Sequence, residues 1–254
     1  MEAVEFGTGG TDTILLIPGN MMTWHQFDEL IPLLAANHHV IAVSTDGYEG
    51  RTTFTTAEES AQHVEDWLLA HVIETVDLVF GESFGSATAA MMLLRQRVTA
   101  HSMILNGPQH MSLGPLNALV SWYIPRNQHR LVGNVAEARA TGRFPWLLKA
   151  YTRSSDASLA RMFQPMAENI SLETLQNAMS EALSLYDTIG SYPPDVTARV
   201  AVWHGAKEPN MRGALRELRK VFPALEDHPF PGLGHGEVLL NPGLTAAEIE
   251  AFMA

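Results

Sequence analysis

The chain has 254 residues, of which 46% are hydrophobic and 17% are charged, and its formal net charge is -12 at pH 7. This composition is sufficient for a large hydrophobic core in one folded unit. The acidic charge, with Lys and Arg scattered along the sequence, excludes nucleic acid and anionic membranes as expected partners and slightly favours neutral or cationic substrates. The absence of cysteine excludes disulfides, a thiolate nucleophile and zinc sites with sulfur ligands.

Targeting and metal-binding signals are absent from the sequence. The start, Met1 to Glu5, is acidic where a secretory signal would be basic, and no hydrophobic run approaches the ~20 residues that span a bilayer. We therefore expect a cytoplasmic protein without a membrane partner. The 11 histidines show no ligand-like spacing with carboxylates on a helix face, so we expect no metal and no other cofactor. No oligomeric state is predicted.

Short hydrophobic runs rich in β-branched residues alternate along the chain with longer segments of helical periodicity. This alternation predicts an α/β fold with a mostly parallel sheet and helices on both faces. The predicted strands are Thr13–Ile17, Val40–Ser44, Val76–Phe80, Ser102–Leu105, Val200–Trp203 and Glu226–Phe230. The predicted helices are Trp24–Leu34, Ala57–Leu69, Ser86–Gln96 and Thr245–Met253.

The segment 108–194, called the insertion below, interrupts this alternation. It has helical composition, contains Pro125 and Pro145 and shows no clear strand. We expect it to form a helical cap over one end of the sheet, inserted in a core made of 1–107 and 195–254. The hydrophobic underside of such a cap would form a substrate pocket, for which the candidates are Met21, Met111, Trp122 and Trp146.

The segment Gly81-Glu82-Ser83-Phe84-Gly85 joins a predicted buried strand to a predicted helix. A tight turn in this position exposes a serine hydroxyl at the carboxyl end of the sheet, beside a helix N-terminus. The flanking glycines leave room for so sharp a turn. Ser83 is therefore the predicted nucleophile, whereas in a plain turn it would only cap the helix.

A serine nucleophile needs a base to take its proton and a carboxylate to orient that base. His235 lies in a glycine-rich loop between the last predicted strand and the last helix, where the base is expected. Glu208 is the only carboxylate in the loop that follows the strand Val200–Trp203, and it is the predicted orienting acid. The alternative carboxylates are Asp187, Asp195 and Glu237.

The order Ser83, Glu208, His235 along the chain resembles that of the α/β-hydrolase superfamily. The resemblance extends from about Thr13 to the C-terminus outside the insertion and includes the loop Asp46–Arg51. It implies an oxyanion hole made of the main-chain N–H groups of Asn20 and Phe84, with Met21 as the alternative to Asn20.

The chain also departs from the family pattern. Pro18 stands where the family usually has the His of a His-Gly pair, and Ser86 stands where a third glycine is frequent. Only about Ala3 to Phe6 is available for the usual N-terminal hairpin, so the sheet is expected to lack one or two strands. The acid is Glu208 rather than the commoner Asp.

These residues predict a capped carboxylester hydrolase that acts on a small, largely apolar substrate. A serine argues against dehalogenase or epoxide-hydrolase chemistry, which uses Asp at this site in the superfamily. Thioesterase, lactonase, amidase and carbon-carbon bond hydrolase activities share the same triad and stay open, as does a receptor-like binding protein without turnover.

Overall fold

The computed structural model describes residues 1–108, 123, 127, 137–138, 140–193, 196–209 and 211–254. Within these residues, seven strands form one sheet in the order β1-β3-β2-β4-β5-β6-β7. β1 pairs antiparallel with β3, and all other pairs are parallel. The strands are β1 Glu2–Phe6, β2 Thr13–Ile17, β3 His39–Ser44, β4 Thr75–Glu82, β5 Thr99–Asn106, β6 Arg199–Gly205 and β7 Glu226–Phe230.

The sheet confirms the predicted fold class. Each of the six strands predicted from hydrophobic runs is present, and β2 and β7 begin and end at the predicted residues. β4 continues through Glu82, so it leads directly to Ser83. The single edge strand β1 takes the place of an N-terminal hairpin.

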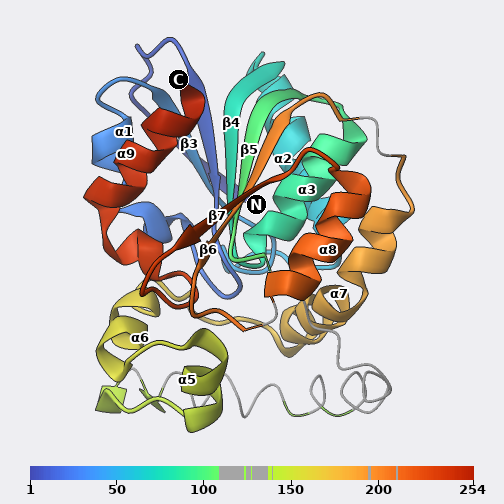
Figure 1. Ribbon diagram of the computed structural model, residues 1–254. Coiled ribbons are helices and arrows are strands. Elements are labelled where there is room, and N and C mark those ends of the chain that lie inside the picture. The colour runs from blue at the N-terminus through green and yellow to red at the C-terminus, as the bar shows by residue number, and fades with distance from the viewer. Residues whose placement is uncertain (109–122, 124–126, 128–136, 139, 194–195, 210) are drawn as a thin grey trace.

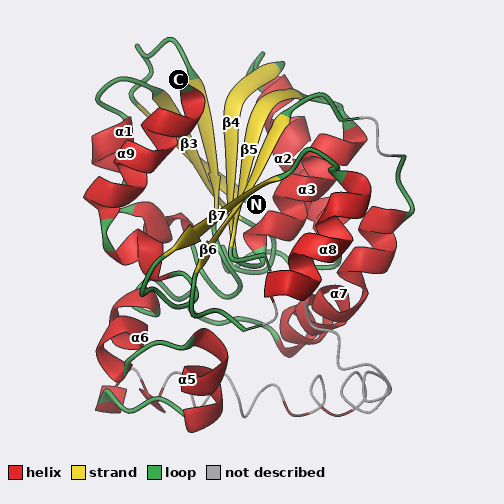
Figure 2. Ribbon diagram, in the orientation of Figure 1, coloured by secondary structure: helices red, strands yellow, loops and turns green. Residues whose placement is uncertain are grey.

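Helices cover both faces of the sheet (Figure 2). On one face lie the short helix η1 Trp24–Phe27, α1 Ile31–Leu34 and α9 Pro242–Met253, whose hydrophobic residues pack with Leu16, Phe80 and Trp203. On the other face lie α2 Ala57–Ala70, α3 Gly85–Arg95 and α8 Met211–Val221. The two hydrophobic clusters bury the sheet from both sides and so fix the carboxyl ends of its strands.

One predicted helix is wrong in extent. The segment Trp24–Leu34 was predicted as a single helix, but it forms η1 and the separate four-residue helix α1. Pro32 lies in the first turn of α1. Because proline lacks an N–H and its ring collides with the carbonyl four residues earlier, a helix can begin near Pro32 but cannot run through it.

The described part of the insertion contains α5 Trp146–Thr152, α6 Asp156–Met162 and α7 Leu172–Gly190. Figure 1 shows α5 and α6 together beyond one end of the sheet, while α7 lies beside α8. Leu185 and Ile189 of α7 join the hydrophobic cluster beneath α3 and α8. The division into a core and a separate cap therefore stays a prediction. None of the described helices is long and hydrophobic enough to cross a membrane.

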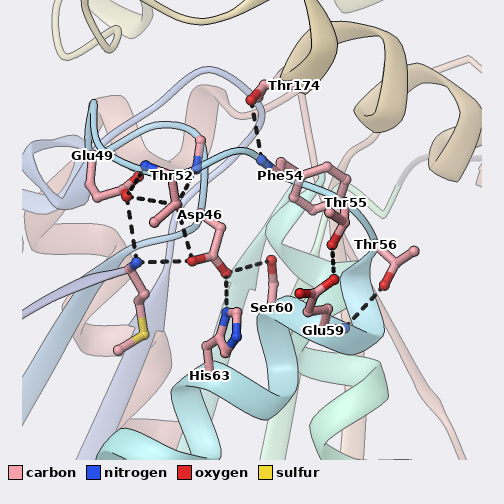
Figure 3. A network of polar contacts seen from close by, with 12 residues as sticks. Asp46, Glu49, Thr52, Phe54, Thr55, Thr56, Glu59, Ser60, His63 and Thr174 are labelled. Carbon is pink, nitrogen blue, oxygen red and sulfur yellow. Dashed lines mark hydrogen bonds and ion pairs between the residues drawn. The ribbon is translucent and has the colours of Figure 1, made fainter.

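The loop after β3 is held by a buried carboxylate, Asp46 (Figure 3). Its Oδ2 accepts hydrogen bonds from Ser60 Oγ at 3.2 Å and from His63 Nδ1 at 2.9 Å, both on α2. Its Oδ1 accepts from the Met1 amino group at 2.9 Å. Burial tends to raise the pKa of Asp46, but these hydrogen bonds and positive charges outweigh it and lower that pKa. The loop is thereby fixed, and it carries Tyr48 towards the site described next.

Candidate active site

Ser83 occupies a strained turn between β4 and α3. Its φ angle is +50°, in the left-handed region that side chains other than glycine rarely adopt. A Cβ atom at Gly81 would lie 2.8 Å from the Gly85 carbonyl oxygen, and a Cβ atom at Gly85 would lie 2.4 Å from the Pro18 carbonyl oxygen. The two glycines are thus required by close backbone contacts. The Ser86 hydroxyl, in place of a third glycine, donates to the Gly81 carbonyl at 2.8 Å.

Three side chains from loops after β4, β6 and β7 form a hydrogen-bonded chain. Ser83 Oγ lies 2.8 Å from His235 Nε2, and His235 Nδ1 lies 2.7 Å from Glu208 Oε2. The second oxygen of Glu208 accepts from the Gly205 N–H at 2.7 Å. These distances are within the range that allows His235 to take a proton from Ser83 while Glu208 holds the imidazole. The structure thus brings together the three residues chosen from the sequence.

Two further contacts, which the sequence analysis did not identify, place the His235 ring. Gly107 follows β5 with a φ of +59°, and a Cβ atom there would lie 2.9 Å from His235 Cε1. The main-chain N–H of His235 donates to the main-chain carbonyl of Thr152, at the end of α5, at 2.7 Å. The position of Gly107 after a predicted strand was visible in the sequence, but its contact with a residue 128 positions later was not.

The electrostatic surroundings of His235 favour its protonated form. Burial is the largest single influence and lowers the pKa of His235, but the hydrogen bond and charge of Glu208, together with the charge of Glu82, raise it further than burial lowers it. An imidazolium that forms as Ser83 reacts would therefore be stabilised. The ring of Tyr151 lies 5.8 Å from the His235 ring, and burial raises the pKa of Tyr151 to about 12.

The loop after β2 lies against the nucleophile. A Cβ atom at Gly19 would lie 3.4 Å from Ser83 Cβ. Tyr48 fixes this loop: its hydroxyl donates to Asn20 Oδ1 at 2.5 Å, and a main-chain hydrogen bond from Met21 reaches the same hydroxyl. Burial raises the pKa of Tyr48, so it stays a donor. Among the described residues, the main-chain N–H groups of Asn20 and Phe84 have no acceptor, which leaves them available to an oxyanion.

The same loop contacts the insertion. The Ala167 N–H donates to the Met21 carbonyl at 2.7 Å, and the Thr23 N–H donates to the Pro165 carbonyl at 3.3 Å. Met21 packs against a small hydrophobic cluster formed by Met22 and by insertion residues that include Met166. The insertion therefore contacts both the loop of Asn20 and, through Thr152, the loop of His235.

The other predicted site residues are dispersed. Asp187 is exposed on α7, and Glu237 accepts from the Gly234 N–H at 2.7 Å instead of contacting His235. Trp146 is 72% exposed at the start of α5. Asp195, Met111 and Trp122 lie outside the described residues. The pocket roles of Met21, Met111, Trp122 and Trp146 stay predictions.

Glu82, immediately before the nucleophile, has a role that the sequence did not indicate. Its side chain is buried and accepts a hydrogen bond from Asn106 Nδ2. Burial raises the pKa of Glu82 to about 7, against the lowering effects of His235 and Asn106. Within the part of the chain that the structure describes, no group of three or more His, Asp or Glu residues is placed to hold a metal ion.

Comparison with known proteins agrees with this fold. A sequence profile of the Alpha/beta hydrolase family matches residues 14–248, and the chain belongs to this family. Family membership supports hydrolase activity. No curated protein matches the chain by sequence.

Solved structures share the fold at low sequence identity. An alpha/beta hydrolase family protein from Desulfitobacterium hafniense superimposes with a TM-score of 0.84 at 22% identity, covering 100% of both chains. A carboxylesterase of the thaumarchaeon Nitrososphaera gargenis gives a TM-score of 0.74 at 15% identity, covering 99% of this chain and 93% of the other. A thermophilic esterase from Thermogutta terrifontis gives 0.69 at 15% identity, covering 99% and 92%.

Proposed function

We propose that the protein is a serine hydrolase that cleaves a carboxylic ester of a small, largely apolar substrate through an acyl-enzyme on Ser83. The observation that carries this proposal is the continuous hydrogen-bonded chain from Ser83 Oγ through His235 to Glu208. A serine hydroxyl becomes a useful nucleophile only when a base is in contact with it and a third group orients that base. Both contacts are made by side chains that are largely shielded from water, which supports the proposal.

In the first half-reaction, Ser83 Oγ forms a bond to the ester carbonyl carbon as its proton moves to His235 Nε2. The carbonyl oxygen becomes an oxyanion, for which the Asn20 and Phe84 N–H groups are the proposed donors. A donor of this kind is worth ~3 kcal/mol of transition-state stabilisation. The tetrahedral intermediate then expels the alcohol, which takes the proton from His235.

In the second half-reaction, water attacks the acyl group on Ser83. His235 takes one proton from this water and returns it to Ser83 Oγ as the acid product leaves. Glu208 keeps the Nδ1 proton of His235 in place and balances the positive charge of the ring in both steps. The triad would act on thioesters, lactones, amides or activated carbon-carbon bonds in the same way, so the pocket decides among them.

The test is covalent labelling by a fluorophosphonate probe, which reacts only with an activated serine. We expect the wild type to be labelled and Ser83→Ala to be unlabelled. With a chain-length panel of nitrophenyl esters, Ser83→Ala should lose at least about 10⁴-fold in kcat. A folded wild type that is neither labelled nor active would overturn the enzyme proposal in favour of a receptor-like protein.

A further inference from the structure

A cavity of about 560 Å³ lies beside the proposed triad without including Ser83 or His235 in its wall. Instead, their chain neighbours Glu82 and Gly236 line it. The remaining wall comes from η1 and its flanking residues, from the end of α6 and the segment that follows it, and from the short helix η3 Glu237–Leu240. Its volume is within the range of small-molecule sites.

The buried carboxylate of Glu82 contributes to the wall of this cavity. The residue is only 2% exposed, and Asn106 Nδ2 contacts its Oε2. Its Oε1 lies on the cavity side: a Cβ atom at Gly236, which also lines the cavity, would lie 3.0 Å from that oxygen. Among the described residues, Asn106 donates to Oε2, whereas Oε1 is not a fully buried atom, so a ligand in the cavity can donate a charge-assisted hydrogen bond to it.

The charged residues in the rest of the lining favour a ligand of positive charge. Besides Glu82, its lining includes the exposed carboxylates of Asp28, Glu29 and Glu168. The lining also contains Arg161, whose charge is balanced by Glu29 at 3.3 Å, and His25, which contacts Asp28 at 3.0 Å. The cavity is therefore negative both at its exposed rim and at Glu82, and this arrangement attracts cations.

The size and chemistry of the lining narrow the ligand further. Besides its polar groups, the wall includes the apolar side chains of Leu30, Met162, Pro165 and Met166. A short alkyl chain fits such a wall, and a protonated amine at its end would donate a hydrogen bond to Glu82 Oε1. A bare metal ion would find only one buried carboxylate there.

We propose that this cavity is a subsite for a protonated aliphatic amine carried by the substrate, with Glu82 as its specificity-determining residue. This inference rests on the proposed ester hydrolysis at Ser83, because it assigns the subsite to that substrate. Glu82 contacts the non-reacting part of the substrate and takes no part in bond making or breaking.

The test compares two esters of the same acid that differ only in charge, a 2-(dimethylamino)ethyl ester and its shape-matched 3-methylbutyl ester. Because either end of an ester could enter the cavity, a second pair carries the same two groups on the acyl side. The measured quantity is the ratio of kcat/KM for the charged ester to that for the neutral one. We expect Glu82→Gln to lower this ratio by about tenfold in at least one pair.

The matched control is Glu74→Gln. Glu74 is exposed just before β4, whereas Glu82 ends that strand, so the control removes the same charge from the opposite end of the same element. Its ratio should equal that of the wild type. An unchanged ratio in Glu82→Gln, in both pairs, would overturn the subsite.

A second measurement needs no variant at Glu82. In the wild type the ratio should rise between about pH 6 and about pH 7.5, because the amine of the charged ester is still mostly protonated there while Glu82 ionises. Titration of His235 changes the reactivity of Ser83 towards both esters of a pair, and the charges of His235 and Glu208 act on the pKa of Glu82. A ratio that is flat over this range contradicts the proposal.

A binding measurement on inactive variants tests the subsite independently of the proposed ester hydrolysis. Calorimetric titration of the charged ester into Ser83→Ala, and into Ser83→Ala with Glu82→Gln, requires no turnover. We expect binding to the first and at least about tenfold weaker binding to the second. If no ester is hydrolysed by the wild type, the proposed function fails, and equal binding by the two variants would refute the subsite as well.

Discussion

Both carboxylate oxygens of Glu208 face donors, which makes the residue sensitive to the smallest change in its chemistry. Oε1 accepts from the Gly205 N–H and Oε2 from His235 Nδ1. In Glu208→Gln the single amide oxygen must face the Gly205 N–H, which can only donate. The amide NH₂ would then face His235 Nδ1 and force the ring proton onto Nε2, where it points at Ser83 and blocks proton transfer.

We therefore expect Glu208→Gln to lower kcat for an ester by about 10³- to 10⁴-fold, with little change in the free energy of unfolding. Steady-state kinetics and urea denaturation would measure the two effects. The control is Asp187→Asn, which alters an exposed carboxylate on α7 and should leave kcat at the wild-type value. Near-normal turnover by Glu208→Gln would mean that another carboxylate orients His235.

Individual site residues can be predicted from the sequence when their role depends on the elements next to them along the chain. Ser83 follows from a strand, a glycine-flanked turn and a helix, and His235 from a glycine-rich loop after the last strand. Gly107, Tyr48 and Glu82 do not follow, because their roles depend on contacts with residues distant in sequence. Tyr48, for example, acts on Asn20 through a hydrogen bond between two separate loops.

Among the elements, the turn between β4 and α3 has the least room for change. A methyl group at Gly85 would meet the main-chain oxygens of Pro18 and Ile17 at 2.4 and 2.6 Å. These atoms belong to β2 and its loop, in the middle of the sheet, so neither can move without displacing Asn20 from Ser83.

Gly85→Ala should therefore lower the free energy of unfolding by at least about 2 kcal/mol and also reduce esterase activity. Gly243→Ala is the matched control: Gly243 lies in the first turn of α9, and a Cβ atom there has no neighbour within 4 Å. Thermal or urea denaturation should show Gly243→Ala as stable as the wild type or slightly more stable. Equal stability of the two variants would contradict the proposed crowding.

The elements also show how far periodicity alone can be trusted. The strands β2 to β6 were predicted well because each contains a short hydrophobic run that is buried in the middle of the sheet. The segment Trp24–Leu34 has helical spacing, but Pro32 imposes a break within it. The helix α8 was not predicted, although Met211, Leu215 and Leu218 are buried at helical spacing, because its other residues are strongly polar and dilute the signal.

The stability of the whole molecule depends on pH through Glu82, a residue next to the candidate nucleophile. Its pKa is raised from the model-compound value of 4.5 to about 7 in the folded protein. Between these two values the folded state holds a proton that the unfolded chain has released. The free energy of unfolding therefore falls, through this group, as pH rises from about 4.5 to about 7.

Glu82→Gln removes this titration, so its stability relative to the wild type should increase with pH by up to about 3 kcal/mol. Urea denaturation of both proteins at about pH 4.5 and about pH 8 measures the difference. The raised pKa of His235 adds a slope of the same sign to both proteins. Parallel stability curves would show that Glu82 has an ordinary pKa in the folded state.

The insertion contacts both sides of the candidate site through main-chain hydrogen bonds, among them one from His235 to Thr152 and one from Ala167 to Met21. Each bond hides one amide hydrogen for as long as that contact is closed. Deuterium exchange at these two amides would therefore time the opening of each side separately. Matching rates would describe a segment from α5 to Ala167 that opens as a unit, and unequal rates would describe one that opens on one side at a time.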